Sequence, residues 1–409
     1  MSLARRLSLG LGLSQMVSWG TSFYLPAVIA GIAARSLRVS EAAILGGFSW
    51  AVLLSGLCAP RMGKFVDRHG GREMLAGGIA VMAAGLVVLA AAHGAAMWYA
   101  GWTVLGIGMA LGLYDAAFAT TGRLLGRDAS PVITGITLVA GFASTVFWTA
   151  GVGLVGAVGW RGTLLLYAGL QLAVNLPMVL WLVPRAAPAP PRAAAVATTG
   201  VARRTRSTAI GWLSGYFTLR WLITSAIAVY VLHLFEGVGL TRREAVLAAA
   251  LIGPGQVVGR LVEWGLAGRL GLLARARMGA ALFPLGVGLL LVAGGPVAAC
   301  GFSVLYGMSN GIMTINRGTL PLAIFGPAGY AALIGWLAVP VQLGQAAAPT
   351  LAAPVVAALT AREVFGVAGA LAAIGFCLLL PLRIVAPEVA PEFAPEVAPG
   401  AAPEADRPG

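Results

Sequence analysis

Hydrophobic runs of about 20 residues recur along almost the whole chain, and short polar connections separate them. A run of this length is what an α-helix needs to cross the ~30 Å hydrocarbon core of a membrane. Twelve runs are predicted, at residues 9–34, 41–62, 74–93, 96–121, 131–158, 162–184, 209–235, 243–264, 278–299, 301–324, 330–358 and 364–385. The pattern predicts an all-α integral membrane protein with twelve transmembrane helices.

The predicted helices fall into two groups of six that repeat one design. Residues 101–126 align with residues 301–326 at an offset of 200 without a gap, and glycines coincide at both ends of the alignment. Parallel six-helix repeats are a known transporter architecture, with the substrate site between the repeats near the middle of the membrane. We expect an N-terminal bundle at 1–184, a cytoplasmic linker at 185–208, a C-terminal bundle at 209–386 and a disordered cytoplasmic tail at 387–409.

The net charge of +13 has a topological explanation. Of the 27 Lys and Arg residues, 19 fall on the predicted connections or helix ends of one side and six on the other, and two lie inside predicted helices. This asymmetry is the positive-inside pattern, so we expect a multi-pass protein of a bacterial-type inner membrane with both termini in the cytoplasm. The expected partners are the lipid bilayer and a small-molecule solute, with no nucleic acid. We expect a monomer without cofactor or metal, since the three cysteines show no metal-ligand spacing.

The most charged stretch is "GKFVDRHGGREML" at residues 63–75, in the predicted connection between the second and third helices. One interpretation is an ordinary positive loop that holds the topology. Its order, Gly-x-Phe-x-Asp-Arg-x-Gly-Gly-Arg, also resembles the signature loop of the major facilitator superfamily, while "WGTSFY" in the first helix loosely resembles its monocarboxylate-porter-like branch. The superfamily resemblance implies a gate that latches the two halves on the cytoplasmic side. The candidate gating residues are Gly63, Asp67, Arg68, Gly70, Arg72 and, at the end of the eighth helix, Arg260.

Three ionisable residues lie well inside predicted helices: Asp115 in the fourth, Arg220 in the seventh and Arg317 in the tenth. Such residues are costly in a membrane and mark functional sites by default. At 1.5 Å per residue they lie about 12, 16 and 13 Å from the cytoplasmic helix ends, so they share one layer. In the family resembled, the first, fourth, seventh and tenth helices line the central cavity. Neighbouring candidates for substrate binding are Tyr216, Asn310, Thr314, Gln15, Trp19, Ser22 and Tyr24, and Gln342 and Gln345 of the eleventh helix could also face this chamber.

Two arginines and one aspartate leave an excess positive charge that a bound anion would neutralise. Guanidinium groups match carboxylates in bidentate geometry, so we expect Arg317 and Arg220 to bind a small organic anion. Asp115 is the natural candidate for proton coupling, because it is the only carboxylate deep in a predicted helix. The alternative is that Asp115 pairs with one arginine only to hold the two halves in register.

We therefore expect a secondary active transporter that moves a small anionic organic solute by alternating access. An exporter of drugs or toxic metabolites, including arsenicals, is an open alternative. A membrane sensor that binds its ligand without transport is another. An integral membrane enzyme would need clustered nucleophiles, histidines or carboxylates, and the three histidines are scattered. No Gly-x4-Gly-Lys-Ser/Thr loop occurs, which argues against direct use of ATP.

Overall fold

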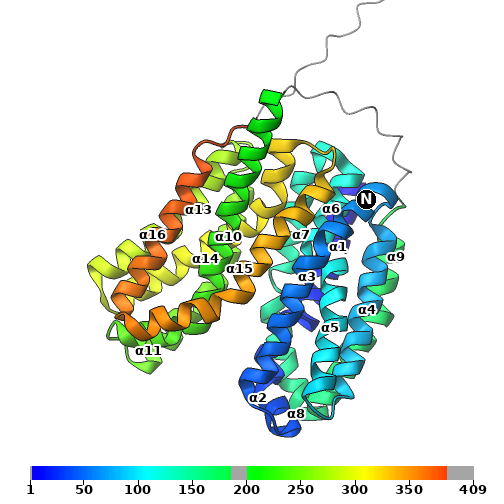
Figure 1. Ribbon diagram of the computed structural model, residues 1–409, viewed down its shortest axis with the longest axis horizontal. Helices are drawn as coiled ribbons and strands as arrows, with labels where there is room; N and C mark the ends of the chain where they lie inside the picture. The colour runs from blue at the N-terminus through cyan, green and yellow to red at the C-terminus, as the bar shows by residue number, and fades with distance from the viewer. Residues whose placement is uncertain (1, 186–199, 385–409) are drawn as a thin grey trace, which may run out of the picture.

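The computed structural model describes residues 2–185 and 200–384, with side chains from residue 206 in the second range (Figure 1). The predicted linker lies largely, and the predicted tail entirely, outside the described residues. The first half of the chain forms α1 Leu3–Thr21, α2 Pro26–Leu37, α3 Glu41–His69, α4 Arg72–Ala90, α5 Ala95–Gly112, α6 Tyr114–Leu125, α7 Ala129–Ala140, α8 Ala143–Leu170 and α9 Leu176–Leu182, with short η1 Gly126–Asp128 and η2 Gln171–Asn175. The second half forms α10 Gly200–Gly237, α11 Arg242–Ala250, α12 Ile252–Gly265, α13 Leu272–Ala293, α14 Gly295–Phe325, α15 Tyr330–Ala358 and α16 Ala361–Leu379.

The helices account for the twelve predicted membrane passes. Within the described ranges, nine segments are long and apolar enough to span a membrane, and one of them, Ala95–Leu182, runs for 88 residues. This segment is about 130 Å of helix at 1.5 Å per residue, and it turns at η1 and at Gly159, where φ is 72°, to make three passes. The 31-residue α14 adds the last pass, and its polar residues lower its mean hydropathy. The prediction of an all-α fold with twelve transmembrane helices is confirmed.

The two halves meet on one side of the molecule and diverge toward the other (Figure 1). We call the first the terminus side, because α1 begins and α16 ends there; α2 and α11 lie on the opposite side. On the terminus side α3 packs antiparallel to α15. A Cβ at Gly56 would overlap Gln342, and one at Gly63 would overlap the backbone of Ala331. Glycine therefore lets the two helices approach closely where the halves are closed against each other.

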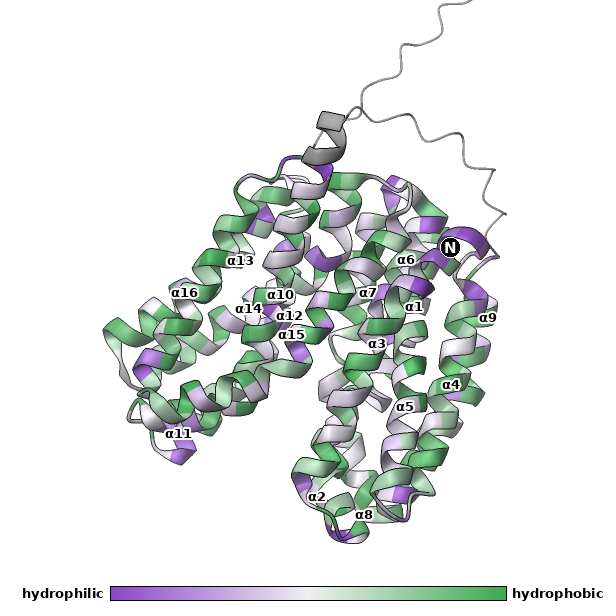
Figure 2. Cartoon of the chain, in the orientation of Figure 1, coloured by the Kyte–Doolittle hydropathy of each residue, from purple (hydrophilic) through white to green (hydrophobic). Residues whose placement is uncertain are grey.

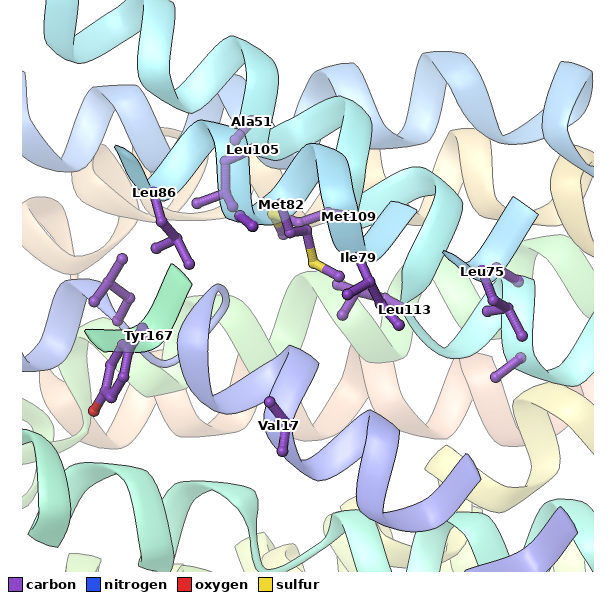
Figure 3. Close-up of a cluster of buried hydrophobic side chains, with 14 of the residues drawn as sticks. Val17, Ala51, Leu75, Ile79, Met82, Leu86, Leu105, Met109, Leu113 and Tyr167 are labelled. Carbon is purple, nitrogen blue, oxygen red and sulfur yellow. The ribbon is translucent and has the colours of Figure 1, made fainter. Parts of the chain in front are cut away.

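Small residues also set the packing inside the N-terminal half. A Cβ at Gly85 would lie 2.7 Å from the Leu105 backbone nitrogen, and a Cβ at Gly108 would lie 2.7 Å from that of Met82, so α4 and α5 nearly touch. Figure 3 shows Met82, Leu105 and their neighbours in the buried cluster along this contact. The α4–α5 pair in turn packs, through α5, against α3, which contacts the other half.

The outer surface of the helices is apolar (Figure 2). Large side chains that no protein contact covers include Trp181 at 83%, Val292 at 89% and Val297 at 86% exposure. Hydrophilic residues gather at the helix ends on both sides (Figure 2). Lipid is the solvent that such an exterior requires.

Two of the predicted spans are broken near their middle. The first is interrupted between α1 and α2 at Ser22–Leu25, ahead of Pro26. The fourth is interrupted at Leu113, whose backbone is extended with φ −86° and ψ −169°. Non-helical backbone at membrane depth is tolerated only where it is buried in protein or lines a cavity. Both breaks therefore point to the region between the halves.

Candidate functional site

Asp115 and Arg317 form an ion pair that joins the two halves. Arg317 Nε donates to Asp115 Oδ1 at 2.9 Å, and Arg317 Nη2 donates to Asp115 Oδ2 at 2.7 Å. The break at Leu113 starts α6 at Tyr114, so Asp115 stands in the first turn of a new helix, where the helix dipole favours a negative charge. The pair is only partly buried, with 11% of the arginine and 19% of the aspartate side chain exposed. Both charged groups therefore keep some accessible surface.

This ion pair faces a pocket between the halves. The pocket is lined from the N-terminal half by Trp19, Phe23, Val52, Ser55, Ala59, Met109, Ala110, Leu113, Tyr114 and Asp115, and from the C-terminal half by Trp221, Thr314, Arg317, Gln342 and Gln345. Five of the residues named from the sequence thus lie together with Asp115: Trp19, Thr314, Arg317, Gln342 and Gln345. Trp221 was missed, although an aromatic residue beside an intramembrane arginine is a signal that could have identified it.

Arg220 does not line this pocket, which corrects the expectation of a shared chamber. Its side chain is completely buried inside the C-terminal half, and its Nη2 donates to Ser309 Oγ at 3.0 Å and to Asn310 Oδ1 at 3.2 Å. The guanidinium also lies 5.0 Å from the ring centroid of Phe283. Tyr216 and Asn310 are buried beside Arg220 rather than in the pocket lining. The position of this group indicates a role in joining α10 to α14.

The other candidates of the first span, in α1 and in the break that follows it, also lie outside the pocket lining. Gln15 Nε2 donates to the Gly112 carbonyl at 2.7 Å and so satisfies a backbone group at the end of α5. Ser22 Oγ donates to the Ser18 carbonyl at 2.6 Å. Tyr24 packs against Trp19, with ring centroids 6.2 Å apart. None of Gln15, Ser22 and Tyr24 is among the pocket-lining residues.

The structure corrects the predicted loop at 63–75: residues 63–69 form the last turns of α3, α4 begins at Arg72, and only Gly70 and Gly71 connect the two helices. The gating candidates of this stretch reach the other half at two points. Asp67 Oδ2 accepts a hydrogen bond from the backbone nitrogen of Ala332 at 2.9 Å, in the first turn of α15. Gly63 lies directly against Ala331. A carboxylate at a helix N-terminus satisfies a free backbone donor and interacts favourably with the helix dipole. Asp67 thus contacts the C-terminal half where the halves are closed.

The other gating candidates of residues 63–75 make no described contact with the C-terminal half. Arg72 donates to the Leu180 carbonyl and so ties α4 to α9 within the N-terminal half. Arg68 is exposed. Gly70 has φ 88°, which favours glycine, and it ends α3.

Arg260 lies away from the loop that was expected to form the gate. It is 5% exposed and sits between α12 and α7, where a Cβ at Gly141 would overlap its guanidinium. It is close enough to Tyr24 and Tyr114 for electrostatic interaction. Its Nη2 donates to Gln256 Oε1 at 3.5 Å, while its Nε and Nη1 have no hydrogen-bond partner among the described residues. Arg260 is thus a buried cation at the contact between the halves.

The described residues offer no metal centre. No group of three or more His, Cys, Asp or Glu side chains comes together in residues 2–185 or 206–384. The charged groups that the structure places between the halves include the Asp115–Arg317 pair, Arg260 and Asp67.

Comparison with known proteins settles the family. The model of the Major Facilitator Superfamily matches residues 7–327. The chain belongs to this superfamily. No curated protein matches the sequence at a significant level. The resemblance to this superfamily that residues 63–75 indicate is confirmed.

Solved major facilitator structures share the fold along nearly the whole chain. The human organic anion transporter MFSD10 (TETRAN) gives a TM-score of 0.72 at 17% identity, covering 93% of this chain and 100% of that chain. FucP in the outward conformation gives 0.69 at 14% identity, covering 90% and 97%. The proton:xylose symporter XylE, bound to 6-bromo-6-deoxy-D-glucose, gives 0.67 at 11% identity, covering 92% and 95%. At these identities the likeness concerns the fold alone.

Membership in the superfamily establishes the class of activity. The protein is a multi-pass membrane transporter of small-molecule solutes, and its function is transport rather than enzymatic catalysis.

Proposed function

We propose that this protein carries a small organic anion together with a proton by alternating access, in an inner membrane with the terminus side in the cytoplasm. The observation that carries the proposal is the bidentate Asp115–Arg317 ion pair, which joins the halves and faces the pocket. The same pair supplies a cation that recognises a carboxylate and a carboxylate that can take up a proton.

The anionic substrate is supported by the charges around the pocket. Arg317 binds Asp115 in a fork geometry that a solute carboxylate can match equally well. Arg260 adds a positive charge that no carboxylate among the described residues neutralises. An anion that enters between Asp115 and Arg317 therefore gains a guanidinium partner in a region of net positive charge.

Proton coupling follows from what happens to Asp115 when the anion arrives. A carboxylate that loses its partner in a mostly apolar pocket is an uncompensated charge, which costs several kcal/mol in a protein interior. Taking up a proton removes this cost. Anion binding at Arg317 and protonation of Asp115 are thus linked, and the loaded pocket carries the same net charge as the empty one.

Alternating access is supported by the asymmetric contact between the halves. α3 and α15 close the terminus side through Gly56, Gly63 and Asp67, while the halves diverge toward the opposite side (Figure 1). This arrangement corresponds to an outward-facing state if the terminus side is cytoplasmic. Opening of the terminus side then requires α3 and α15 to move apart at their glycine-mediated contact.

The test is uptake of labelled organic acids and organic cations into proteoliposomes, with protein-free liposomes to measure passive leak. We expect acid uptake that follows an imposed pH gradient and is insensitive to an imposed membrane potential. Arg317→Ala should abolish uptake, and Asp115→Asn should retain exchange of labelled for unlabelled acid while losing the response to the pH gradient. Arg242→Ala, which removes an exposed ion pair with Glu236, is the matched control. Preferential uptake of cations that survives Arg317→Ala would refute the proposal.

A further inference from the structure

Aromatic side chains from both halves surround the ion pair in the pocket. Trp19, Phe23 and Tyr114 contribute from the N-terminal half, and Trp221 contributes from the C-terminal half. The ring centroid of Trp19 lies 4.8 Å from those of Phe23 and Tyr114, so these rings form one continuous surface. Trp221 lies against the ion pair, with its ring centroid 5.6 Å from the guanidinium carbon of Arg317. The charged group of a ligand on Arg317 would therefore have the Trp221 indole beside it.

The two tryptophans also carry hydrogen-bond donors that the described residues leave unsatisfied. The indole Nε1 atoms of Trp19 and Trp221 are buried and have no acceptor among the described residues. Indole is a donor only, and the one carboxylate in the pocket lining, Asp115, already accepts from Arg317. A buried donor without a partner is unfavourable, and the described residues leave both indole donors without an acceptor.

We infer that the cargo is a small aromatic carboxylate, whose ring packs between Trp19 and Trp221 and whose carboxylate binds Arg317. This inference rests on the proposed anion transport and narrows its substrate class. Aromatic pairs gain binding energy beyond the area they bury, and an aliphatic ring of the same size does not. Because the two indoles belong to different halves, one aromatic ring in contact with both would draw the halves together around the cargo. The contacts that recognise the aromatic ring would then be the same contacts that close the two halves around it.

The decisive measurement is binding of two matched acids to the purified full-length protein by isothermal titration calorimetry at neutral pH. Benzoate and cyclohexanecarboxylate have the same charge and the same number of carbon atoms, and they differ in the aromatic ring. We expect benzoate to bind about ten-fold more tightly, in line with the gain from one to two aromatic pairs. Benzyl alcohol, which keeps the ring and lacks the carboxylate, should not bind measurably.

Substitutions of the two tryptophans test whether their indole rings cause the preference for benzoate. Trp19→Leu and Trp221→Leu should each reduce the benzoate preference severalfold and leave cyclohexanecarboxylate binding nearly unchanged, whereas the Phe variants should restore most of the preference. Trp181→Leu is the matched control, because the Trp181 side chain is 83% exposed on the outer surface. Circular dichroism and gel filtration of each variant report its folding.

The possible outcomes separate the two proposals. Equal affinities for the two acids, both lost in Arg317→Ala, would overturn the aromatic preference and leave anion transport standing. Binding of benzyl alcohol as tightly as benzoate, unaffected by Arg317→Ala, would overturn both. A benzoate preference that survives both Leu variants would overturn the assignment to Trp19 and Trp221.

Discussion

Replacing Gly63 by valine should shift the transporter toward the conformation that is open on the terminus side. Gly63 belongs to α3 and lies against the first turn of α15. A Cβ at this position would lie 2.8 Å from the carbonyl carbon of Ala331 and 3.0 Å from the Cα of Ala332. Both contacts are with backbone atoms, which cannot rotate away as a flexible side chain would. The substitution therefore acts on the closed contact itself.

The size of the effect follows from these distances. Ordinary contacts of a Cβ begin at 3.4 Å, so α3 and α15 must separate by at least 0.6 Å, the difference between 3.4 and 2.8 Å, before the valine methyl groups are counted. Overpacking of this kind costs about 1–3 kcal/mol. Because the strain exists only in the closed state, the open state should gain roughly 5- to 150-fold in relative population.

Electron–electron double resonance measures this population directly. Spin labels at Asp128→Cys and Arg269→Cys, both at exposed sites on the terminus side of opposite halves, are introduced after replacement of Cys58, Cys300 and Cys377. Gly63→Val should transfer intensity from a short to a longer distance. Gly77→Val is the control, because it makes the same chemical change in helix α4 where nothing lies within 4 Å of the added Cβ.

The result that would refute the reasoning is a distance distribution for Gly63→Val that matches the Gly77→Val control in a protein of equal thermal stability. A loss of folded protein alone would not produce this match. Equal distributions would mean that the α3–α15 contact does not limit closure of the terminus side.

Three further predictions concern other contacts. Asp67→Ala removes the acceptor of the 2.9 Å hydrogen bond from Ala332 N, so it should lengthen the same spin-label distance; an unchanged distribution would contradict a latching role. Arg260→Met removes a buried cation with two unpaired nitrogens, so the melting temperature in detergent should rise while anion uptake falls; a lower melting temperature would contradict this account. Asn175→Ala leaves Gln171 Oε1 without its 2.7 Å donor inside the N-terminal half, so stability should fall by about 1–3 kcal/mol with the KM of uptake unchanged; an altered KM would show a link to the pocket.

The helix plan was predictable because membrane crossing constrains the sequence directly. A span must be apolar over a fixed length, and the twelve runs and the repeat at an offset of 200 express that constraint. Asp115 and Arg317 were equally visible, since an ionisable residue inside a span needs a partner. The structure brings these two together, and it answers which arginine pairs with the aspartate.

Arg220 shows where the sequence stops being informative. It satisfies the same rule as Arg317, and its neighbours Tyr216 and Asn310 are also polar or amphipathic. However, successive residues of a helix point about 100° apart at 3.6 residues per turn, so Arg220 and Trp221 face different surroundings. The first enters the interior of the C-terminal half, and the second enters the pocket between the halves. Both surroundings accept polar side chains, so periodicity alone could not distinguish them.

The break at Leu113 was also hidden in the sequence. The run at 96–121 is continuous in hydropathy, yet α5 ends at Gly112 and α6 begins at Tyr114. Gln15, which was interpreted as a chamber residue, binds the Gly112 carbonyl at 2.7 Å and thereby stabilises the break from another helix. A tertiary contact of this kind has no signature within the run itself. Because of the break, Asp115 lies at a helix N-terminus instead of inside a continuous helix.

The position of the ion pair explains how one pocket could couple two ligands. Asp115 and Arg317 are 202 residues apart, close to the repeat offset of 200, so they come from equivalent places in the two halves and lie near the axis that relates them. Groups near this axis move least when the halves rock around a fixed site, so the empty transporter can keep its neutral pair in both states. Binding of the anion alone would leave Asp115 as an unpaired charge, and binding of a proton to Asp115 alone would leave Arg317 unpaired. Only the empty and the doubly loaded transporter avoid an unpaired charge, so the proposed coupling would rest on charge balance in the pocket.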